Sequence, residues 1–454
     1  MKVRKGKKAI LGCIIALLVL ISVGCSSNAN ETVDTKELYI TDENYVEYQV
    51  MDRVDSPEHV AFVPEAAETS EKDFNENITL VVERILNQDA FMLKKGTVQP
   101  VGVEEFSSWE LACDEGGNNR EQSAPNPLSY LTVGISSNLL TQLERGIDIM
   151  KLDVDSVKVE VEVGFRWSGV MTDDWSGYTD TVNTNIVIES NESPEKLAEL
   201  QEMALNGWVA GEGLANSTEI NPELIINGEH WEENYSIPGG VVNDVSVVDD
   251  FTVTQRTTDF EPETIEIGKE AGGGGMDPEG GKPLFIPAGG FEVEFKVIGI
   301  AETTDDPIRP YLQKVTVRAI QENYVPWIVY VDDSYGYEGI EKAPTSLEYL
   351  TAGIGLCLTS QLSVAMMTLD DSEQTIDDFR VEQQINYRSE NPMTEDMAGY
   401  TDKIYSYVML DSDLPENVLN DYFNLAVNMC FAGEAFLNET DMTTNMYING
   451  KIIK

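Results

Sequence analysis

Alternating apolar and polar residues predict the strands of this chain, and longer apolar runs predict its helices. Residues 157–165 alternate strictly, which indicates a strand with one buried face. Apolar, β-rich segments predict further strands at 78–85, 291–298 and 314–319, and final strands ending at Ile226 and Ile448. One helix should begin in each Pro-containing stretch at 124–127 and 343–346, and a second near Ser193-Pro194 and Asp413-Leu-Pro415. Strands, helix, strands, helix and strand in that order predict an α+β fold.

An internal repeat organises this pattern. Residues 124–135 read APNPLSYLTVGI and residues 343–354 read APTSLEYLTAGI, eight identities in twelve at an offset of 219. The second copy then gains three residues, and the offset becomes 222 for Gly177-Tyr-Thr-Asp180 with Gly399-Tyr-Thr-Asp402, and for Ala210-Gly-Glu212 with Ala432-Gly-Glu434. Two constant offsets indicate a duplicated domain. We assign the first copy to 78–235, the second to 291–454, and the acidic, Gly-rich stretch 236–290 to a linker.

The N-terminus has the pattern of an export signal. A basic head is followed by an apolar run over 9–23 and then Gly24-Cys25. This ending resembles a bacterial lipoprotein cleavage box, although Ser22 stands where Leu is usual. The resemblance implies a signal peptide at 1–24 and lipidation of Cys25, which would anchor the protein to the outer face of the cell membrane. The alternative is an uncleaved, rather short membrane span. Residues 25–77 are acidic and weakly periodic, and are interpreted as a tether.

Charge and composition exclude several function classes. The chain has 454 residues, and its 80 Asp and Glu against 30 Lys and Arg give a formal charge of −50. Such a surface repels phosphate backbones, so a nucleic-acid partner is not expected. Only two histidines, His59 and His230, argue against His-rich zinc sites and Ser-His-Asp chemistry. No segment fits the spaced acidic loop of calcium sites, so neither a metal nor a cofactor is expected.

Three cysteines remain once Cys13 in the signal and Cys25 are set aside: Cys113, Cys357 and Cys430. Three cysteines outside the cytoplasm allow one disulfide and one free thiol. Cys113 is interpreted as a core thiol.

Two stretches of the second copy resemble the OsmC/Ohr superfamily, the osmotically inducible and organic hydroperoxide resistance proteins. Residues 343–358 (APTSLEYLTAGIGLCL) are similar to that family's first-cysteine helix, and 425–431 (LAVNMCF) to its second-cysteine helix. The family forms dimers with two peroxide-reducing sites. The resemblance therefore implies two tandem OsmC-like domains that form an internal pseudodimer, and a monomer in solution.

The resemblance also implies site residues. Cys357 would attack the peroxide and become a sulfenic acid, and Cys430 would condense with it to a disulfide that an extracytoplasmic dithiol reduces. The family uses an Arg from the N-terminal strands to activate the thiol, and Arg318 is the nearest candidate. In the first copy Asn138 and Trp208 occupy the two cysteine positions, so that copy is degenerate. The Glu that the organic hydroperoxide branch carries before the first helix is Leu347 here.

Two functions remain open from the sequence. The first is an exported, lipid-anchored thiol peroxidase that reduces organic hydroperoxides through Cys357 and Cys430. The second is a non-catalytic surface lipoprotein, whose pseudodimer cleft binds an apolar small ligand or a partner and whose Cys357–Cys430 pair is a structural disulfide.

Overall fold

The fold is known from a computed structural model. It describes residues 50–54, 58–59, 74–84, 93–101, 107–115, 122–170, 172, 174–227, 235–236, 252–271, 289–307, 309–321, 324–334, 341–366 and 376–453. The expected signal peptide, Cys25 and most of the expected tether lie outside these residues.

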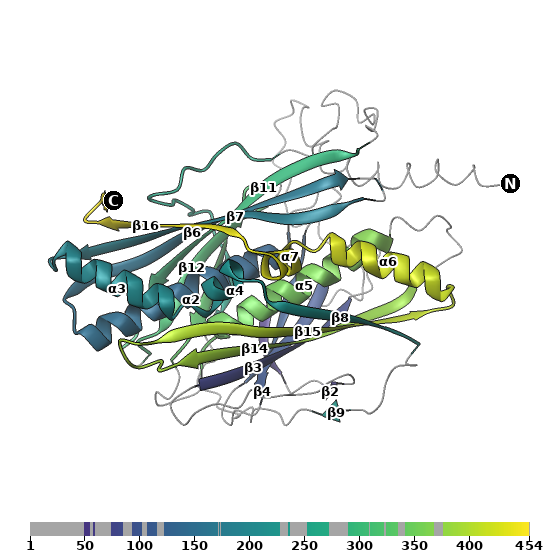
Figure 1. The fold of residues 1–454 in the computed structure, drawn as a ribbon, viewed down its shortest axis with the longest axis horizontal. Helices are drawn as coiled ribbons and strands as arrows, with labels where there is room; N and C mark the ends of the chain where they lie inside the picture. Colours follow the sequence, from purple (N-terminus) through teal and green to yellow (C-terminus); the bar gives the residue numbers. More distant parts are fainter. Residues whose placement is uncertain are drawn as a thin grey trace, which may run out of the picture.

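Two large sheets carry the architecture, which is α+β as the sequence predicts (Figure 1). Sheet one has the strand order β1 (Met51–Val54), β5 (Ser108–Cys113), β4 (Lys94–Val101), β3 (Phe74–Arg84), β14 (Ile376–Glu390), β15 (Ala398–Ser412) and β8 (Glu219–Ile226). Sheet two has the order β10 (Thr254–Arg256), β13 (Trp327–Asp332), β12 (Leu312–Ala319), β11 (Phe291–Thr303), β6 (Val154–Val170), β7 (Ser176–Ser190), β16 (Asp441–Ile448) and β17 (Lys451–Ile453). A small pair joins β2 (Glu58–His59) to β9 (Tyr235–Ser236).

The two repeats exchange strands, so neither holds a complete sheet. In sheet one, β3 of the first repeat pairs antiparallel with β14 of the second; in sheet two, β11 of the second pairs with β6 of the first. The last strands cross back in parallel, β8 onto β15 and β16 onto β7. The chain is therefore an interleaved pair of repeats related by approximate two-fold symmetry.

The helices fill the space between the sheets. They are α2 (Pro127–Met150), α3 (Pro194–Asn206), α4 (Val209–Ala215), α5 (Ser346–Met366), α6 (Glu416–Asn428) and α7 (Phe431–Leu437). Helix α2 packs on sheet two, α5 packs on sheet one, and the two helices pack on each other (Figure 1). Caps set the helix starts as predicted: the side chain of Asn126 accepts from the Ser129 amide before α2, and that of Ser193 from the Lys196 amide before α3.

Two glycines allow α2 and α5 to cross closely. A β-carbon on Gly134 would lie 2.6 Å from the backbone nitrogen of Leu350, and one on Gly353 would lie 2.5 Å from that of Leu131. Beside this crossing the rings of the equivalent residues Tyr130 and Tyr349 stack with centroids 5.9 Å apart. Helix α5 is long and apolar enough to cross a membrane, but 94% of its most apolar window is buried inside the fold, as in a core helix.

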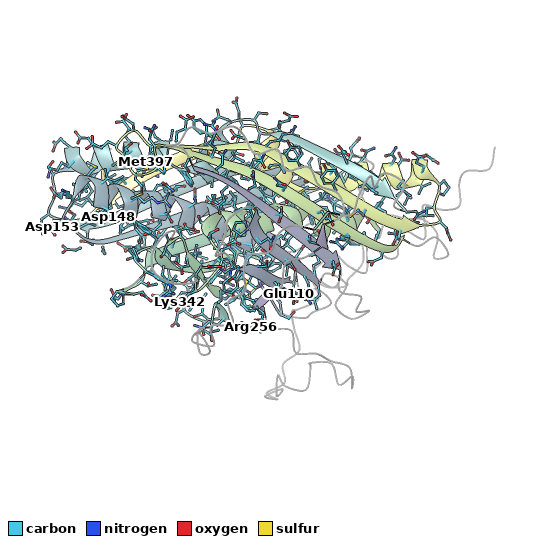
Figure 2. All side chains as sticks on the ribbon, turned by 90° about the horizontal axis from the view of Figure 1, so that it is seen from below. Glu110, Asp148, Asp153, Arg256, Lys342 and Met397 are labelled. Carbon is cyan, nitrogen blue, oxygen red and sulfur yellow. The ribbon has the colours of Figure 1, made fainter. Side chains whose placement is uncertain are left out.

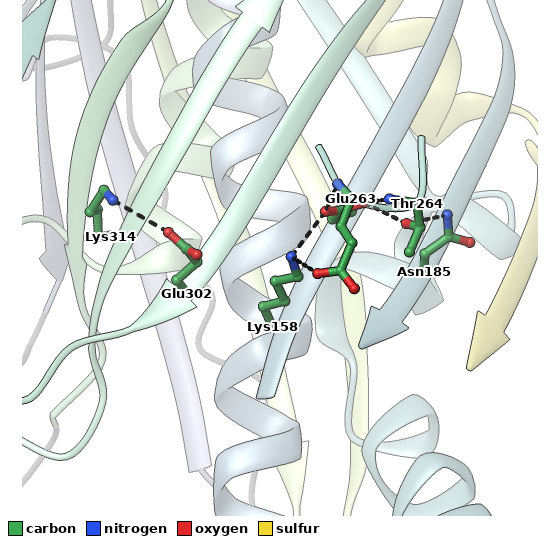
Figure 3. Close-up of polar contacts among 7 residues, drawn as sticks. Lys158, Asn185, Glu263, Thr264, Glu302 and Lys314 are labelled. Atoms are coloured by element: carbon green, nitrogen blue, oxygen red, sulfur yellow. Dashed lines mark hydrogen bonds and ion pairs between the residues drawn. The ribbon is translucent and has the colours of Figure 1, made fainter. Parts of the chain in front are cut away.

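Residues 252–271 of the expected linker 236–290 pack against sheet two, so the prediction of a linker over the whole range is corrected. Residues 254–256 form the edge strand β10 of sheet two, and Phe260 packs with Ile298 and Ile300 of β11 on the outer face of this sheet. The buried carboxylate of Glu160 accepts from the amides of Glu263 (2.6 Å) and Thr264 (2.8 Å), and Figure 3 shows these contacts beside the Lys158–Glu263 ion pair. Similarly, β3 begins at Phe74 and β1 lies at 51–54, so the expected tether 25–77 contains strands of sheet one. Exposed acidic side chains such as Asp148 and Asp153 lie at one end of the molecule (Figure 2).

Candidate functional site

The structure brings Cys357 and Cys430 together although 73 residues separate them in the chain. Cys357 lies in the middle of α5, and Cys430 is the N-cap residue of α7, where its sulfur accepts from the Gly433 amide at 3.3 Å. Both are free thiols and are close enough for Cys430 to raise the pKa of Cys357, and both are buried, with exposed fractions of 1% and 4%. Two thiols this close are a pair that can form a disulfide with little movement.

The surroundings of Cys357 favour its neutral form. Burial is the main cause that raises the pKa of this thiol well above its ordinary value, and the neighbouring Cys430 and the carboxylate of Glu115 raise it further. The Ala432 amide donates to the sulfur and acts in the opposite direction. At neutral pH the resting pair is therefore protonated at Cys357, and a reaction through the thiolate requires a nearby cation.

A repeated motif fixes the turn that carries Cys430. The Thr179 hydroxyl donates to the Phe431 carbonyl at 2.9 Å, and the Thr179 amide donates to the Glu434 carboxylate at 2.6 Å. A β-carbon on Gly177 would lie 2.4 Å from the Met429 carbonyl oxygen, so only glycine permits this approach. The Gly-Tyr-Thr-Asp motif of one repeat thus binds the segment with the Ala-Gly-Glu motif of the other repeat. We call this contact the clasp.

The symmetry mate of this clasp is equally complete. Thr401 donates to the Val209 carbonyl and to the Glu212 carboxylate, at 3.0 and 2.8 Å. In both copies an Arg pairs with the Asp of the motif and covers its Tyr ring: Arg166 with Asp180 and Tyr178, Arg388 with Asp402 and Tyr400. These contacts give the four residues the same structural role in both copies.

The buried cation beside α5 is Lys94, which the sequence interpretation missed. Its side chain is fully buried, and its Nζ donates to the hydroxyl of Ser360 at 2.6 Å and pairs with Glu115 at 3.3 Å. Ser360 follows Cys357 by one helical turn, so the ammonium lies along the same face of α5. Lys94 comes from β4 of the other repeat. A lysine within an apolar strand was its only signal in the sequence.

Arg318 does not belong to this site. Along β12 the side chains of Gln313, Val315 and Val317 alternate toward the helices, and Gln313 donates to Thr141 of α2. Arg318 has the opposite parity and lies on the outer face, where its guanidinium contacts Glu270 and the Tyr324 carbonyl. The prediction of Arg318 as the activating residue is therefore corrected.

Aromatic side chains cover the cysteine pair. Phe431 follows Cys430 directly, and its ring packs against Phe165, Trp167 and Phe295, with centroids 5.7, 5.1 and 5.4 Å apart. Trp175 packs on Trp167 at 5.5 Å.

The first repeat carries the equivalent position without thiols, as predicted. Asn138 replaces Cys357, and its Oδ1 accepts from the Ala210 amide at 3.1 Å, matching the bond from the Ala432 amide to Cys357. Trp208 replaces Cys430, and its ring nitrogen donates to the Ile135 carbonyl. Cys113 is a buried, free thiol on β5, in agreement with its prediction as a core residue.

No group of three or more His, Cys, Asp or Glu side chains suited to a metal ion occurs within the part of the chain that the structure describes.

Comparison with known proteins gives one structural similarity. No family model matches the sequence, and no curated protein matches it. Among solved structures the chain is similar to an OsmC-like hydroperoxide resistance protein from Jannaschia sp. CCS1, with 14% sequence identity and a TM-score of 0.22, over 35% of this chain and 96% of that chain.

Proposed function

We propose that this protein is an exported, lipid-anchored thiol peroxidase of OsmC type that reduces organic hydroperoxides through Cys357 and Cys430. The observation that carries the proposal is the proximity of these two buried thiols, at the positions that the OsmC/Ohr motifs assign to the attacking and resolving cysteines. The interleaved repeats support the idea of an internal pseudodimer with one thiol site.

The proposed reaction has two steps. The Cys357 thiolate attacks the distal peroxide oxygen, the O–O bond breaks, and the alcohol leaves after taking a proton, so that Cys357 becomes a sulfenic acid. The Cys430 sulfur then attacks the sulfenic sulfur, which forms the disulfide and releases water. A dithiol reductant outside the cytoplasm returns both thiols by exchange. The sum is one hydroperoxide and one dithiol converted to one alcohol, one water and one disulfide.

Lys94 takes the role that the family gives to an Arg. Its ammonium is held by Ser360, one turn of α5 after Cys357, and by Glu115. In the resting structure its charge opposes the burial that raises the pKa of Cys113, the residue opposite Lys94 on β5. A buried cation stabilises a thiolate more than an exposed one does, because water screens it less. Glu115 orients the ammonium and reduces its net effect.

The test uses the full-length chain in detergent, fully reduced. One equivalent of cumene hydroperoxide is added, free thiols are counted over seconds, and any disulfide is mapped by peptide mass. We expect rapid loss of two thiols with a Cys357–Cys430 linkage, abolished in Cys357→Ser. In Cys430→Ser a sulfenic acid should accumulate and be trapped by dimedone. Cys113→Ser is the matched control, since Cys113 is equally buried and outside the pair.

A second function is favoured by two observations, the burial of both thiols and the raised pKa of Cys357. In that case the protein is a non-catalytic surface lipoprotein with a structural Cys357–Cys430 disulfide. Thiol loss no faster than that of free cysteine would reject the peroxidase and leave this alternative.

Location and assembly have tests of their own. Lipidation at Cys25 predicts an N-terminal peptide that begins with diacylglyceryl-cysteine in membrane extracts. A monomer is expected because each repeat already supplies the strands that a second subunit would offer. A delipidated protein that sediments as a stable dimer would contradict this.

A further inference from the structure

A cavity of about 230 Å³ lies between the two repeats, at the position that symmetry relates to the cysteine pair. Its walls come from α2, the start of α5, and β14, and include Asn138, the counterpart of Cys357. At the roughly 30 Å³ that one water occupies in the liquid, the cavity has room for about eight non-hydrogen atoms. It is therefore the size of a small metabolite rather than of a peptide.

Differences between equivalent side chains leave a cavity at one site and fill the same space at the other. Val209 stands where the second site has Phe431, and Ser389 stands where it has Trp167. Both replacements remove an aromatic ring from the cover over the site. Equivalent elements build both sites, so these smaller side chains leave space that aromatic rings fill in the other site.

A basic group lines one wall of the cavity. Arg145 on α2 stands where α5 has Val364. Its guanidinium lies over the Tyr311 ring at 5.8 Å, and its buried Nε has no hydrogen-bond partner among the described residues. A buried donor without an acceptor costs free energy unless a ligand supplies one. Arg145 therefore indicates a ligand with a carboxylate or a similar acceptor.

An acidic group lines another wall. Glu76 on β3 is only 2% exposed, and it shares the inward face of its strand with Ile78 and Leu80. In the other site this position is Phe295. A carboxylate accepts about four hydrogen bonds. Glu76 can therefore accept a hydrogen bond from a ligand ammonium in addition to its contacts within the protein.

The remaining walls favour an organic ligand. Leu347, Val209 and Pro392 supply apolar surface, and Met393 is 60% exposed where the cavity opens to solvent.

The carboxyl group of Asp333 also lines the cavity, where its two oxygens accept from the Thr141 hydroxyl and the Ser346 amide. An anion alone would face the Glu76 carboxylate, and a cation alone would leave the Arg145 Nε without an acceptor. A molecule with both charges satisfies both walls.

We propose that this cavity is a binding site for a small zwitterion of the free amino acid class, whose carboxylate pairs with Arg145 and whose ammonium pairs with Glu76. The site is independent of the thiols, so the degenerate repeat has a binding role of its own.

The test is isothermal titration calorimetry on the purified full-length chain in detergent. The zwitterionic probes are L-alanine, L-leucine and L-glutamine. Two analogues of leucine lack one charge each: 4-methylpentanoate has no amine and isoamylamine has no carboxylate. We expect saturable binding of at least one zwitterion at one site per chain, and binding of each single-charge analogue at least about tenfold weaker.

Symmetry supplies the variants. Val209→Phe copies Phe431 and should fill the cavity and abolish binding, and Arg145→Gln should weaken zwitterion binding at least about tenfold. Lys314→Gln is the control, because it removes a positive charge from an outer-face ion pair with Glu302 (Figure 3). Thermal unfolding of each variant shows whether it has folded. Since Arg145→Gln leaves the packing of Val209 untouched, it keeps the test decisive if Val209→Phe does not fold.

Three results would overturn the proposal. They are no binding by any of the three zwitterions, binding of isoamylamine or 4-methylpentanoate as tight as that of leucine, and binding that persists in folded Val209→Phe. Peroxide-dependent thiol loss is measured on the same samples. It tests the proposed peroxidase activity, so a failure of that proposal can be distinguished from a failure of ligand binding.

Discussion

The crossing of α2 and α5 gives the sharpest prediction about what positions both sites. In Gly134→Ala the added β-carbon would lie 2.6 Å from the nitrogen, 2.7 Å from the α-carbon and 2.8 Å from the β-carbon of Leu350. All of these atoms belong to or sit directly on the backbone of α5. No side-chain rotation can therefore relieve the contact, and the helices must separate.

The magnitude follows from the required movement. Ordinary van der Waals contact begins near 3.4 Å, so the helices must move apart by about 0.8 Å at this point. A gap of that size forfeits about a quarter to a half of the dispersion energy of the atoms that line it, and overpacking a core costs about 1–3 kcal/mol or more. Alanine regains about 1 kcal/mol of helix propensity over glycine. We expect a net loss of about 2 kcal/mol in the free energy of unfolding.

The assay is guanidinium chloride unfolding followed by circular dichroism, with Gly146→Ala as the control in the same helix. There the new β-carbon would meet Leu200 Cδ1 at 2.5 Å, the end of a flexible side chain that can rotate away. This control should change stability by less than about 1 kcal/mol in either direction. A Gly134→Ala protein as stable as the wild type would refute the reasoning, because it would mean that the helices are not in backbone contact.

Three further predictions concern the sites. Phe431→Val introduces the residue found at the equivalent position, Val209. It should remove part of the aromatic cover, speed labelling of Cys357 by a thiol-disulfide reagent, and lower the free energy of unfolding by about 2–3 kcal/mol. Labelling at the wild-type rate would show that these rings do not limit access. Lys94→Met removes the buried cation that pairs with Glu115, and should cost about 3 kcal/mol in chemical unfolding and slow peroxide-dependent thiol loss, whereas an unchanged rate would remove Lys94 from the proposed mechanism. Burial raises the pKa of Glu144 well above its ordinary value of 4.5, so the folded state keeps a proton that the unfolded chain loses as the pH rises. The stabilising effect of this bound proton is full below about pH 4.5 and is lost as the pH rises toward the pKa of the folded state. Glu144→Gln should therefore raise the urea midpoint more at pH 8 than at pH 4.5. An equal change at both pH values would contradict this.

Sequence alone determined the local elements and indicated an internal repeat. The strict alternation of residues 157–165 lies within β6, and Asn126 and Ser193 cap the two helices that the Pro-containing stretches predict. These features depend on neighbours in the chain, since side-chain periodicity and capping are local. The repeat offsets also aligned Cys357 with Asn138 correctly, because the two positions accept from equivalent amides.

Tertiary structure alone decided which repeat supplies each part of a site. Sequence proximity suggested Arg318, but its place in the alternation of β12 puts it on the outer face. Strand exchange instead brings Lys94 of the other repeat to Ser360 on the cysteine helix. Local periodicity contains no information about which sheet edge a strand joins, since that choice depends on contacts between residues far apart in the chain. The same holds for the filled and hollow sites, where ring packing around Phe431 and its absence around Val209 become visible only when distant strands and helices meet.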